Sequence, residues 1–503
     1  MRISLLWEPP AVNPVTRKAL SVPVLNPRDK YGRMFLVNTF AFMIAFLSWY
    51  AFPPLLTKTI KDDLKLTQAE IANSNIMALA ATLLVRLLTG PLCDRFGARK
   101  VFAGVLFLGS LPTFLAATIT NARGLLILRF FIGILGASFV PCQVWSTGFF
   151  DETIVGTANA LMAGIGNAGG GITYFVMPAI FDSLVEDWGL GAGTAWRVAF
   201  VVPGVLIMAT AVGMLVCCED TPRGKWAERH LPGGEDSSVE DVAGNQRSGN
   251  ASSIDLRGKE GSGSQREESA TASILQQQQL LLPIQTGSAN VVQNPTLKES
   301  LKVVFSLQAM MLAAPYACSF GGELAINSIL GAYYNKNFPD LGQTKSGQWA
   351  SMFGLLNIFF RPFGGIAADL IYRHTTLVES KKLWLMAACL FMSLFSLLIG
   401  FLDPHQKATM FSLVAGLAFC MDSANGANFA VVPHVFPHAN GVLSGFVGAM
   451  GNLGGIVFAI VFRYNGVDYA RSIWISGFVM LGVTAVVCWI SPVPKGKKGE
   501  VGR

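Results

Sequence analysis

Two arginines lie inside long apolar stretches of this sequence, where a charged side chain is unusual. Arg86 and Arg361 each open the same pattern, Arg-x-x-x-Gly-x-x-x-Asp, which ends at Asp94 in the first copy and at Asp369 in the second. An arginine in hydrocarbon costs at least about 2.5–3.5 kcal/mol, and it stays protonated there. Two of them on equivalent helices predict a central site, where a compact oxygen-bearing monoanion relieves their repulsion and accepts their forked N–H donors.

A second repeated motif supplies two asparagines surrounded by glycines. Asn167 and Asn452 each lie in a Gly-Asn-x-Gly-Gly motif within an apolar run. A buried amide needs a hydrogen-bond partner, so we expect both amides to add donors to the anion site. The glycines chiefly allow helices to approach closely and to slide or rock against each other. They are Gly164, Gly166, Gly169, Gly170, Gly171, Gly448, Gly451, Gly454 and Gly455.

Acidic side chains from other helices are the alternative partners for the two arginines. Glu323 and Asp422 are the only acids well inside the predicted spans. A buried acid is commonly paired with an arginine or with a backbone group. The same two acids are also the candidates for proton movement, and the sequence leaves both roles open.

The elements that must position these side chains are membrane-spanning helices. The chain has 503 residues, of which 52% are hydrophobic and only 14% are charged, whereas about a quarter are charged in soluble proteins. Successive apolar runs of about 20 residues predict an all-α membrane protein with twelve transmembrane helices. The net charge of +7 comes from basic residues in tails and short loops, so it does not indicate nucleic acid. The eight cysteines show no metal-binding or disulfide spacing.

The twelve predicted spans divide into two six-helix halves. We expect an N-terminal tail over 1–33, the first half over 34–218, a central loop over 219–300, the second half over 301–491 and a C-terminal tail over 492–503. Basic residues in the tails and inside loops place both ends in the cytoplasm. The central loop is rich in Gly, Ser, Gln and charge, which is typical of a largely disordered segment. Serines in basic context, such as Ser248, make it a candidate kinase target, although an ordinary linker is the simpler interpretation.

The motifs together resemble a known transporter family. The segment over residues 90–100 resembles the loop between spans 2 and 3 of the major facilitator superfamily. The runs AGIGNAGGGITYFVMP and GAMGNLGGIVFAIVF resemble the paired nitrate signatures of the nitrate/nitrite porter family, and the long central loop is similar to fungal members. The resemblance implies the twelve-helix fold of that superfamily. It further implies high-affinity nitrate uptake, with nitrite as a second substrate, by proton symport across the plasma membrane.

The resemblance also implies which residues meet the substrate. Arg86, Arg361, Asn167 and Asn452 match the positions that contact nitrate in that family, and aromatic residues of spans 1 and 7 line such sites. The aromatic candidates here are Phe46, Trp49, Tyr316 and Tyr333.

Other functions fit the same sequence less well. A nitrate/nitrite antiporter, a facilitator of another small anion and a membrane nitrate sensor remain the alternatives. An enzyme is not expected, because the chain has no phosphate-binding loop, metal-ligand cluster or nucleophile–base arrangement. We expect no cofactor and no metal, and the expected partners are nitrate, nitrite, protons and the lipid bilayer.

Overall fold

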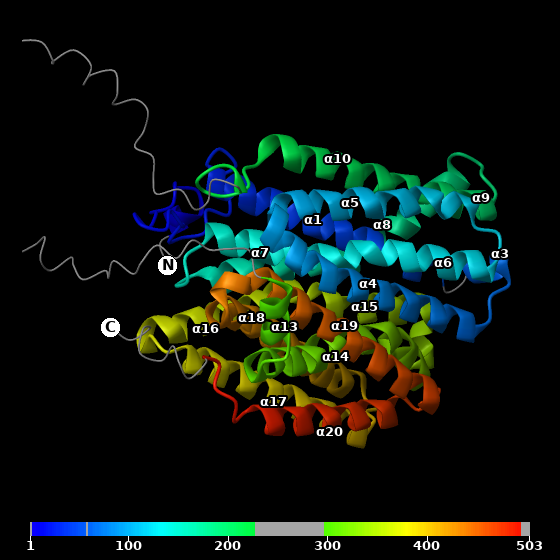
Figure 1. Cartoon of the computed structure of the whole chain (residues 1–503). Coiled ribbons are helices and arrows are strands. Elements are labelled where there is room, and N and C mark those ends of the chain that lie inside the picture. The colour runs from blue at the N-terminus through cyan, green and yellow to red at the C-terminus, as the bar shows by residue number, and fades with distance from the viewer. Residues whose placement is uncertain (1–2, 57–58, 227–295, 494–503) are drawn as a thin grey trace, which may run out of the picture. The chain divides into compact units, whose positions relative to one another are not determined.

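The computed structural model describes residues 3–56, 59–226 and 296–493. Its long helices run side by side, with those of the first half lying together above those of the second half in Figure 1. The first half contains α1 (Lys30–Trp49), α2 (Phe52–Leu56), α3 (Thr59–Leu64), α4 (Gln68–Phe96), α5 (Ala98–Phe114), α6 (Ala122–Ile132), α7 (Phe139–Phe149), α8 (Val155–Glu186), α9 (Ala192–Ala199) and α10 (Val201–Cys217). The second half contains α13 (Leu297–Val304), α14 (Leu307–Asn337), α15 (Gly342–Leu355), α16 (Asn357–Thr375), α17 (Val378–Leu402), α18 (Lys407–Val435), α19 (Asn440–Asn465) and α20 (Tyr469–Val487). The candidate kinase target Ser248 and residues 494–503 of the predicted C-terminal tail lie outside the described residues.

The described residues contain eleven helical segments that are long and apolar enough to cross a membrane. The twelfth span is α18, whose 29 residues are also long enough to cross the hydrocarbon core. Its mean hydropathy is lowered by polar side chains that are all buried. They are Asp422, Ser423, Asn425 and Asn428. The predicted all-α membrane fold is therefore confirmed, and its least apolar span is one that turns polar groups inward.

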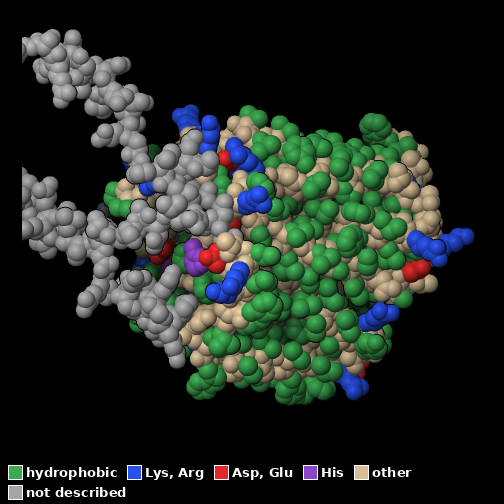
Figure 2. Space-filling view, viewed as in Figure 1, with side chains coloured by type: hydrophobic (Ala, Val, Ile, Leu, Met, Phe, Trp, Pro, Cys, Tyr) green, Lys and Arg blue, Asp and Glu red, His purple; other side chains and the backbone are tan. Residues whose placement is uncertain are grey.

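The surface of the helix bundle fits a lipid environment. Figure 2 shows hydrophobic side chains over the middle of the visible face, with Lys and Arg side chains gathered at its two ends. Large apolar side chains such as Leu88, Phe359 and Val486 are more than 60% exposed. Exposed apolar surface on this scale is stable in hydrocarbon and not in water.

The two halves meet along matched pairs of helices. Helix α4 packs on α19, and α8 packs on α16. A Cβ atom on Gly90 would lie 2.4 Å from the carbonyl oxygen of Gly441, and one on Gly365 would lie 2.4 Å from that of Gly156. Because only glycine permits such an approach, the repeated Arg-x-x-x-Gly-x-x-x-Asp pattern puts the same backbone contact on both sides of the molecule.

The aspartates of the same pattern form hydrogen bonds between the halves beside each of these backbone contacts. Asp94 on α4 accepts hydrogen bonds from the backbone N–H groups of Gly441 and Val442, both at 3.0 Å, at the start of α19. Asp369 on α16 accepts from the backbone N–H and the hydroxyl of Thr157, at 2.5 and 2.8 Å, at the start of α8. A carboxylate at a helix N-terminus is favourable, because unpaired N–H groups and the helix dipole point toward it. Each half therefore caps a helix of the other half.

The predicted N-terminal tail is folded against the end of the bundle where these caps lie. Ala19 donates its backbone N–H to the carbonyl of Phe149 at 2.9 Å and accepts from the N–H of Asp151 at 3.0 Å. Helix α1 begins at Lys30, a few residues earlier than the expected span, because Asp29 caps it. We call this end of the bundle the terminal end; the first and the last described residues of the chain lie there in Figure 1.

A motif glycine offers a direct test of this packing. A Cβ atom on Gly454 of α19 would lie 2.0 Å from the backbone oxygen of Ala317 on α14, whereas one on Gly482 of α20 would meet nothing within 4 Å. We expect Gly454→Ala to destabilise the protein by about 1–3 kcal/mol through overpacking. Gly482→Ala, the matched control, should unfold like the wild type. Thermal unfolding of the purified proteins in detergent measures both, and equal midpoints for the two variants would contradict the contact.

Candidate functional site

The two predicted arginines meet in the middle of the bundle. Arg86 on α4 and Arg361 on α16 are 1% and 0% exposed. Their guanidinium carbons lie 5.1 and 5.4 Å from the centroid of the same ring, that of Phe139 at the start of α7. They also lie 5.3 and 5.7 Å from the ring centroid of Phe320 on α14. One cation from each half therefore lies over the same pair of aromatic rings.

The backbone of both halves holds Arg86. Its Nε donates to the carbonyl of Gly136 at 2.9 Å, and its Nη1 donates to the carbonyl of Gly448 on α19 at 2.8 Å. The side-chain amide of Asn452 donates to that same Gly448 carbonyl at 3.1 Å. The second predicted asparagine is thus linked to Arg86 through one shared acceptor.

Arg361 keeps more of its donors free. Its Nη2 donates to the hydroxyl of Tyr316 at 3.0 Å. Its Nε and Nη1 are buried and have no partner within the described ranges. The ion pairs recorded for those ranges include neither Arg86 nor Arg361, so the alternative of a carboxylate locked onto each arginine is not what the structure contains there. Two buried cations side by side, neither in a direct ion pair among those residues, are costly, and an anion would lower that cost.

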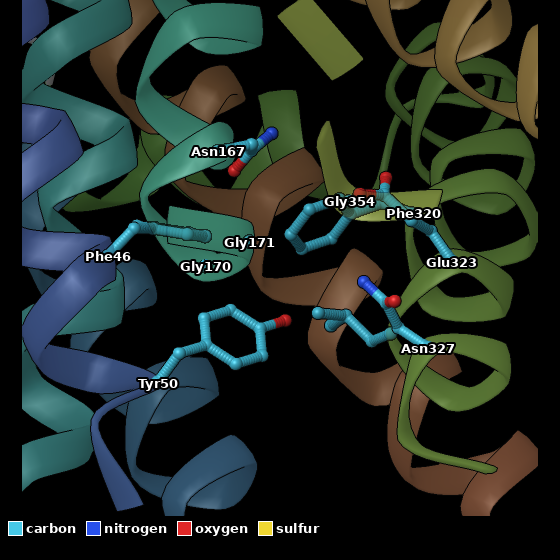
Figure 3. Close-up of a pocket in the computed structure, with 10 residues that line it drawn as sticks. Phe46, Tyr50, Asn167, Gly170, Gly171, Phe320, Glu323, Asn327 and Gly354 are labelled. Atoms are coloured by element: carbon cyan, nitrogen blue, oxygen red, sulfur yellow. The ribbon is translucent and has the colours of Figure 1, made fainter. Parts of the chain in front are cut away.

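Asn167 lies at a small cavity between the halves. It is on α8, it is 6% exposed, and both polar atoms of its amide lack a partner among the residues that the structure describes. Figure 3 shows the Asn167 amide and the Tyr50 hydroxyl facing Phe320 and Asn327 of α14 across the cavity. The cavity leaves about 10 Å³ for the centre of a water-sized sphere, which is about the room that one water molecule needs. A larger ligand would need the walls to move.

The two intramembrane acids lie on the second-half side of this site. Glu323, which lines the cavity, accepts hydrogen bonds from the side-chain amides of Asn357 at 2.8 Å and Asn425 at 2.7 Å. Asp422 on α18 is fully buried, and neither of its oxygens has a hydrogen-bond partner in the described part of the chain. Asp422 interacts electrostatically with both Glu323 and Arg361. The two acids therefore share one polar region with the second arginine.

The predicted aromatic residues divide into two groups. Phe46 lines the cavity, and Tyr316 contacts Arg361. Trp49 is not among the cavity-lining residues, and its ring packs on Tyr50 with a centroid distance of 4.5 Å. Tyr333 lies about 25 Å along α14 from Tyr316 and donates its hydroxyl to Asp403 at 2.7 Å. The structure does not bring the side chains of Trp49 and Tyr333 to Arg86 or Arg361.

Three aromatic residues at the site were not among the sequence candidates. Phe139 and Phe320 lie against both guanidinium groups, and Tyr50 lines the cavity together with Asn167. Phe320 stacks on Tyr316 with ring centroids 5.2 Å apart and an angle of 7° between the rings. The one signal that could have found Phe320 is its spacing of one helical turn from Tyr316 and of three residues from Glu323. Phe139 is one of 35 phenylalanines, and nothing in its neighbourhood marks it.

The motif glycines make room for these groups. Gly170 and Gly171 line the cavity. A Cβ atom on Gly451 would lie 2.8 Å from the ring of Tyr316, and one on Gly166 would lie 1.9 Å from the ring of Phe42. The remaining motif glycines lie against α1, α14, α16 or Arg86; they are Gly164, Gly169, Gly448, Gly454 and Gly455. No group of three or more metal-ligating side chains is found over the residues described.

Comparisons with known proteins show which family the chain resembles. A family model described as Major Facilitator Superfamily matches residues 39–459. The chain is 35% identical to "Elsinochrome transporter 1" of Elsinoe fawcettii, over 98% of this chain and 99% of that protein. It is 29% identical to "High affinity nitrate transporter 2.5" of Arabidopsis thaliana, over 94% of this chain and 81% of that protein. It is 26% identical to "Nitrate/nitrite transporter NrtP" of Nostoc punctiforme, over 92% of this chain and 91% of that protein.

The relatives settle the general class of the protein. Their names describe membrane transporters, which confirms the prediction of a carrier and not an enzyme. The family model spans both halves of the helix bundle, and the similarity to nitrate transporters covers most of the chain. The chain therefore belongs to the major facilitator superfamily, and its similarity to nitrate transporters over most of its length supports the predicted resemblance to the nitrate/nitrite porter family.

Proposed function

We propose that this protein imports nitrate, with nitrite as a second substrate, across the plasma membrane, and that protons drive the uptake. The observation that carries the proposal is the pair Arg86 and Arg361, two buried cations over the same two aromatic rings without a carboxylate ion pair among the described residues. Several relatives are named as nitrate transporters, and one as a nitrate/nitrite transporter.

The chemistry of the site suits a flat and compact monoanion. Two nitrogens of Arg361, Nε and Nη1, and the side-chain amide of Asn167 have no hydrogen-bond partner in the described part of the chain. Guanidinium N–H donors in a fixed fork match the oxygen atoms of a planar oxyanion. The rings of Phe139 and Phe320 supply flat apolar surfaces that keep water away from those hydrogen bonds, and hydrogen bonds to charged groups are stronger in such surroundings. The anion would replace the repulsion between the arginines with attraction to both.

We expect the anion to cross the membrane by alternating access, in which the two halves move against each other around the central site. The first-half helices α4 and α8 contact the second-half helices α19 and α16 through glycines and through the caps made by Asp94 and Asp369. Opening the terminal end requires these caps to break together, while the site stays between the halves. We assign the terminal end to the cytoplasm, because basic residues are concentrated in its loops and tails.

One relative points to a second candidate substrate. The protein named as an elsinochrome transporter matches 98% of this chain at 35% identity. Transport of an elsinochrome by this chain is therefore the competing proposal. The geometry favours the small anion, because the central cavity has room for about one water molecule and Phe320, which lines it, lies against both guanidinium groups. A neutral substrate would leave both cations without a counter-ion.

The proposed function is tested in cells that have no nitrate uptake of their own. We expect tracer nitrate to accumulate only when the chain is expressed, and nitrate to evoke an inward current that grows on acidification. A symporter must carry more than one proton per nitrate to drive an anion into a negative interior, so the net charge moved is positive. Electroneutral uptake would indicate nitrate/nitrite exchange, and binding without uptake would indicate a sensor. Movement of an elsinochrome in the same cells, with no response to nitrate, would overturn the proposal.

A further inference from the structure

A third intramembrane arginine lies away from the central pair. Arg129 is near the end of α6, and it is 3% exposed. Its Nη1 donates to the backbone oxygen of Trp49 at 3.2 Å, and its Nη2 donates to the side-chain oxygen of Asn75 at 2.7 Å. Its guanidinium carbon lies 5.4 Å from the ring centroid of Phe52. All of these neighbours are uncharged.

The surroundings leave the charge of Arg129 uncompensated. None of the ion pairs recorded over 3–56, 59–226 and 296–493 includes Arg129. Its Nε is buried without an acceptor in the same ranges, as is the indole N–H of Trp49, the residue whose carbonyl it holds. A role limited to tying the end of α1 to α4 would be served by a neutral donor at lower desolvation cost. The retained charge and the unused donors indicate a ligand of opposite charge.

The position of Arg129 relates it to the substrate path. Asn75 and Arg86 are both on α4, and Asn75 is about 16 Å further from the terminal end. Tyr50 links the two levels, because it follows Trp49, whose carbonyl accepts from Arg129, and it also lines the central cavity. The first half therefore carries one buried cation at the centre and one nearer the opposite end of the bundle.

We propose that Arg129 forms an outer anion site, distinct from the central pair, that receives a small monoanion before it passes Tyr50 to reach Arg86 and Arg361. The inference rests on the proposed function, because it assumes that nitrate or nitrite travels from the end opposite the terminal end. A buried cation on the path raises the local concentration of the anion and speeds its arrival. It contributes less to the equilibrium affinity of the centre, because the two levels are about 16 Å apart along α4 and the Coulomb attraction falls with distance.

The test uses a substitution that cancels the charge and keeps the shape. Asn75→Asp places a carboxylate where the amide oxygen already accepts from Arg129 at 2.7 Å, so the contact survives as an ion pair. The matched control is Asn121→Asp, which adds the same charge at the exposed N-cap of α6, where aspartate caps equally well. Measurements are the initial slope of tracer nitrate uptake against concentration, nitrate binding to the purified protein at equilibrium, and thermal unfolding.

We expect Asn75→Asp to lower the uptake slope by roughly tenfold, with equilibrium binding within about threefold of wild type and no loss of stability. Asn121→Asp should leave all three unchanged. A folded Asn75→Asp protein with a wild-type slope would overturn the proposal, and so would a fall in equilibrium affinity as large as the fall in slope. If Asn75→Asp does not fold, Arg129→Lys and Arg129→Gln, normalised to surface protein, replace it; equal slopes for these two would overturn the site. A wild-type protein without nitrate uptake would instead refute the proposed function, and the outer site with it.

Discussion

Arg361→Lys should lower kcat/KM for nitrate uptake by roughly 100-fold while the protein still folds. The Nε and Nη1 of Arg361 have no hydrogen-bond partner among the described residues, and its Nη2 donates to the hydroxyl of Tyr316. A lysine keeps the charge, but it replaces a planar fork with a single ammonium group on a flexible stem. A hydrogen bond between charged groups is worth about 1.5–3 kcal/mol, and about 2.8 kcal/mol corresponds to a factor of 100. The comparison therefore isolates geometry from charge.

The same replacement at Arg86 should act by a different route. The Nε and Nη1 of Arg86 donate hydrogen bonds to the carbonyls of Gly136 and Gly448. Arg86 therefore positions the two halves as well as the anion. We expect Arg86→Lys to lose uptake to a similar extent and also to unfold at a lower temperature. Arg373→Lys is the matched control, because Arg373 is an exposed residue near the end of the helix that carries Arg361. Near-normal uptake by both central variants, with the control unchanged, would refute recognition by forked donors.

The repeated sequence pattern explains how much of this site could be predicted. An intramembrane arginine stands out in a sequence because its desolvation is costly, and its recurrence at an equivalent position implies that both copies face one axis. The same pattern contains the glycines and aspartates that join the halves, but the aspartate caps became visible only in the structure. The sequence therefore predicted that the two arginines, which are costly in hydrocarbon and occur at equivalent positions, lie together between the halves.

Features of the site that depend on a single residue of a common type could not be predicted from the sequence. The ring of Phe139 lies beneath both guanidinium groups, yet in sequence it is an aromatic residue in an apolar run like many others. Tyr333 was a candidate because it is an aromatic residue of span 7, but helix length carries it beyond the site to Asp403. The folding of the N-terminal segment depends on long-range bonds to Phe149 and Asp151, which local composition does not reveal. Each of these depends on which residues from distant parts of the chain happen to meet.

The intramembrane acids differ in the partners that could stabilise their ionised forms, which burial disfavours in both. Glu323 accepts two amide hydrogen bonds and interacts electrostatically with Arg361, and both contacts offset part of the cost of burying its charge. Asp422 has no donor in the described residues, and the protonated carboxyl is the form that such a buried place can accommodate. When an anion neutralises Arg361, Glu323 loses part of its stabilisation. Anion binding and proton uptake at Glu323 are then linked, and linkage of that kind is what a symporter requires.

Glu323→Gln should therefore separate binding from coupling. The glutamine amide has nearly the shape of the protonated acid, but it cannot carry the negative charge that interacts with Arg361. We expect nitrate binding to persist, while accumulation of nitrate above its equilibrium level and the acid-stimulated current are lost. Asp422→Asn, which imitates a carboxyl that is already protonated, should change the current less. The measurement is nitrate-evoked current between external pH 5 and 8, together with steady-state tracer accumulation. Wild-type coupling in Glu323→Gln would assign the proton to another carrier, and a loss confined to Asp422→Asn would exchange the roles of the two acids.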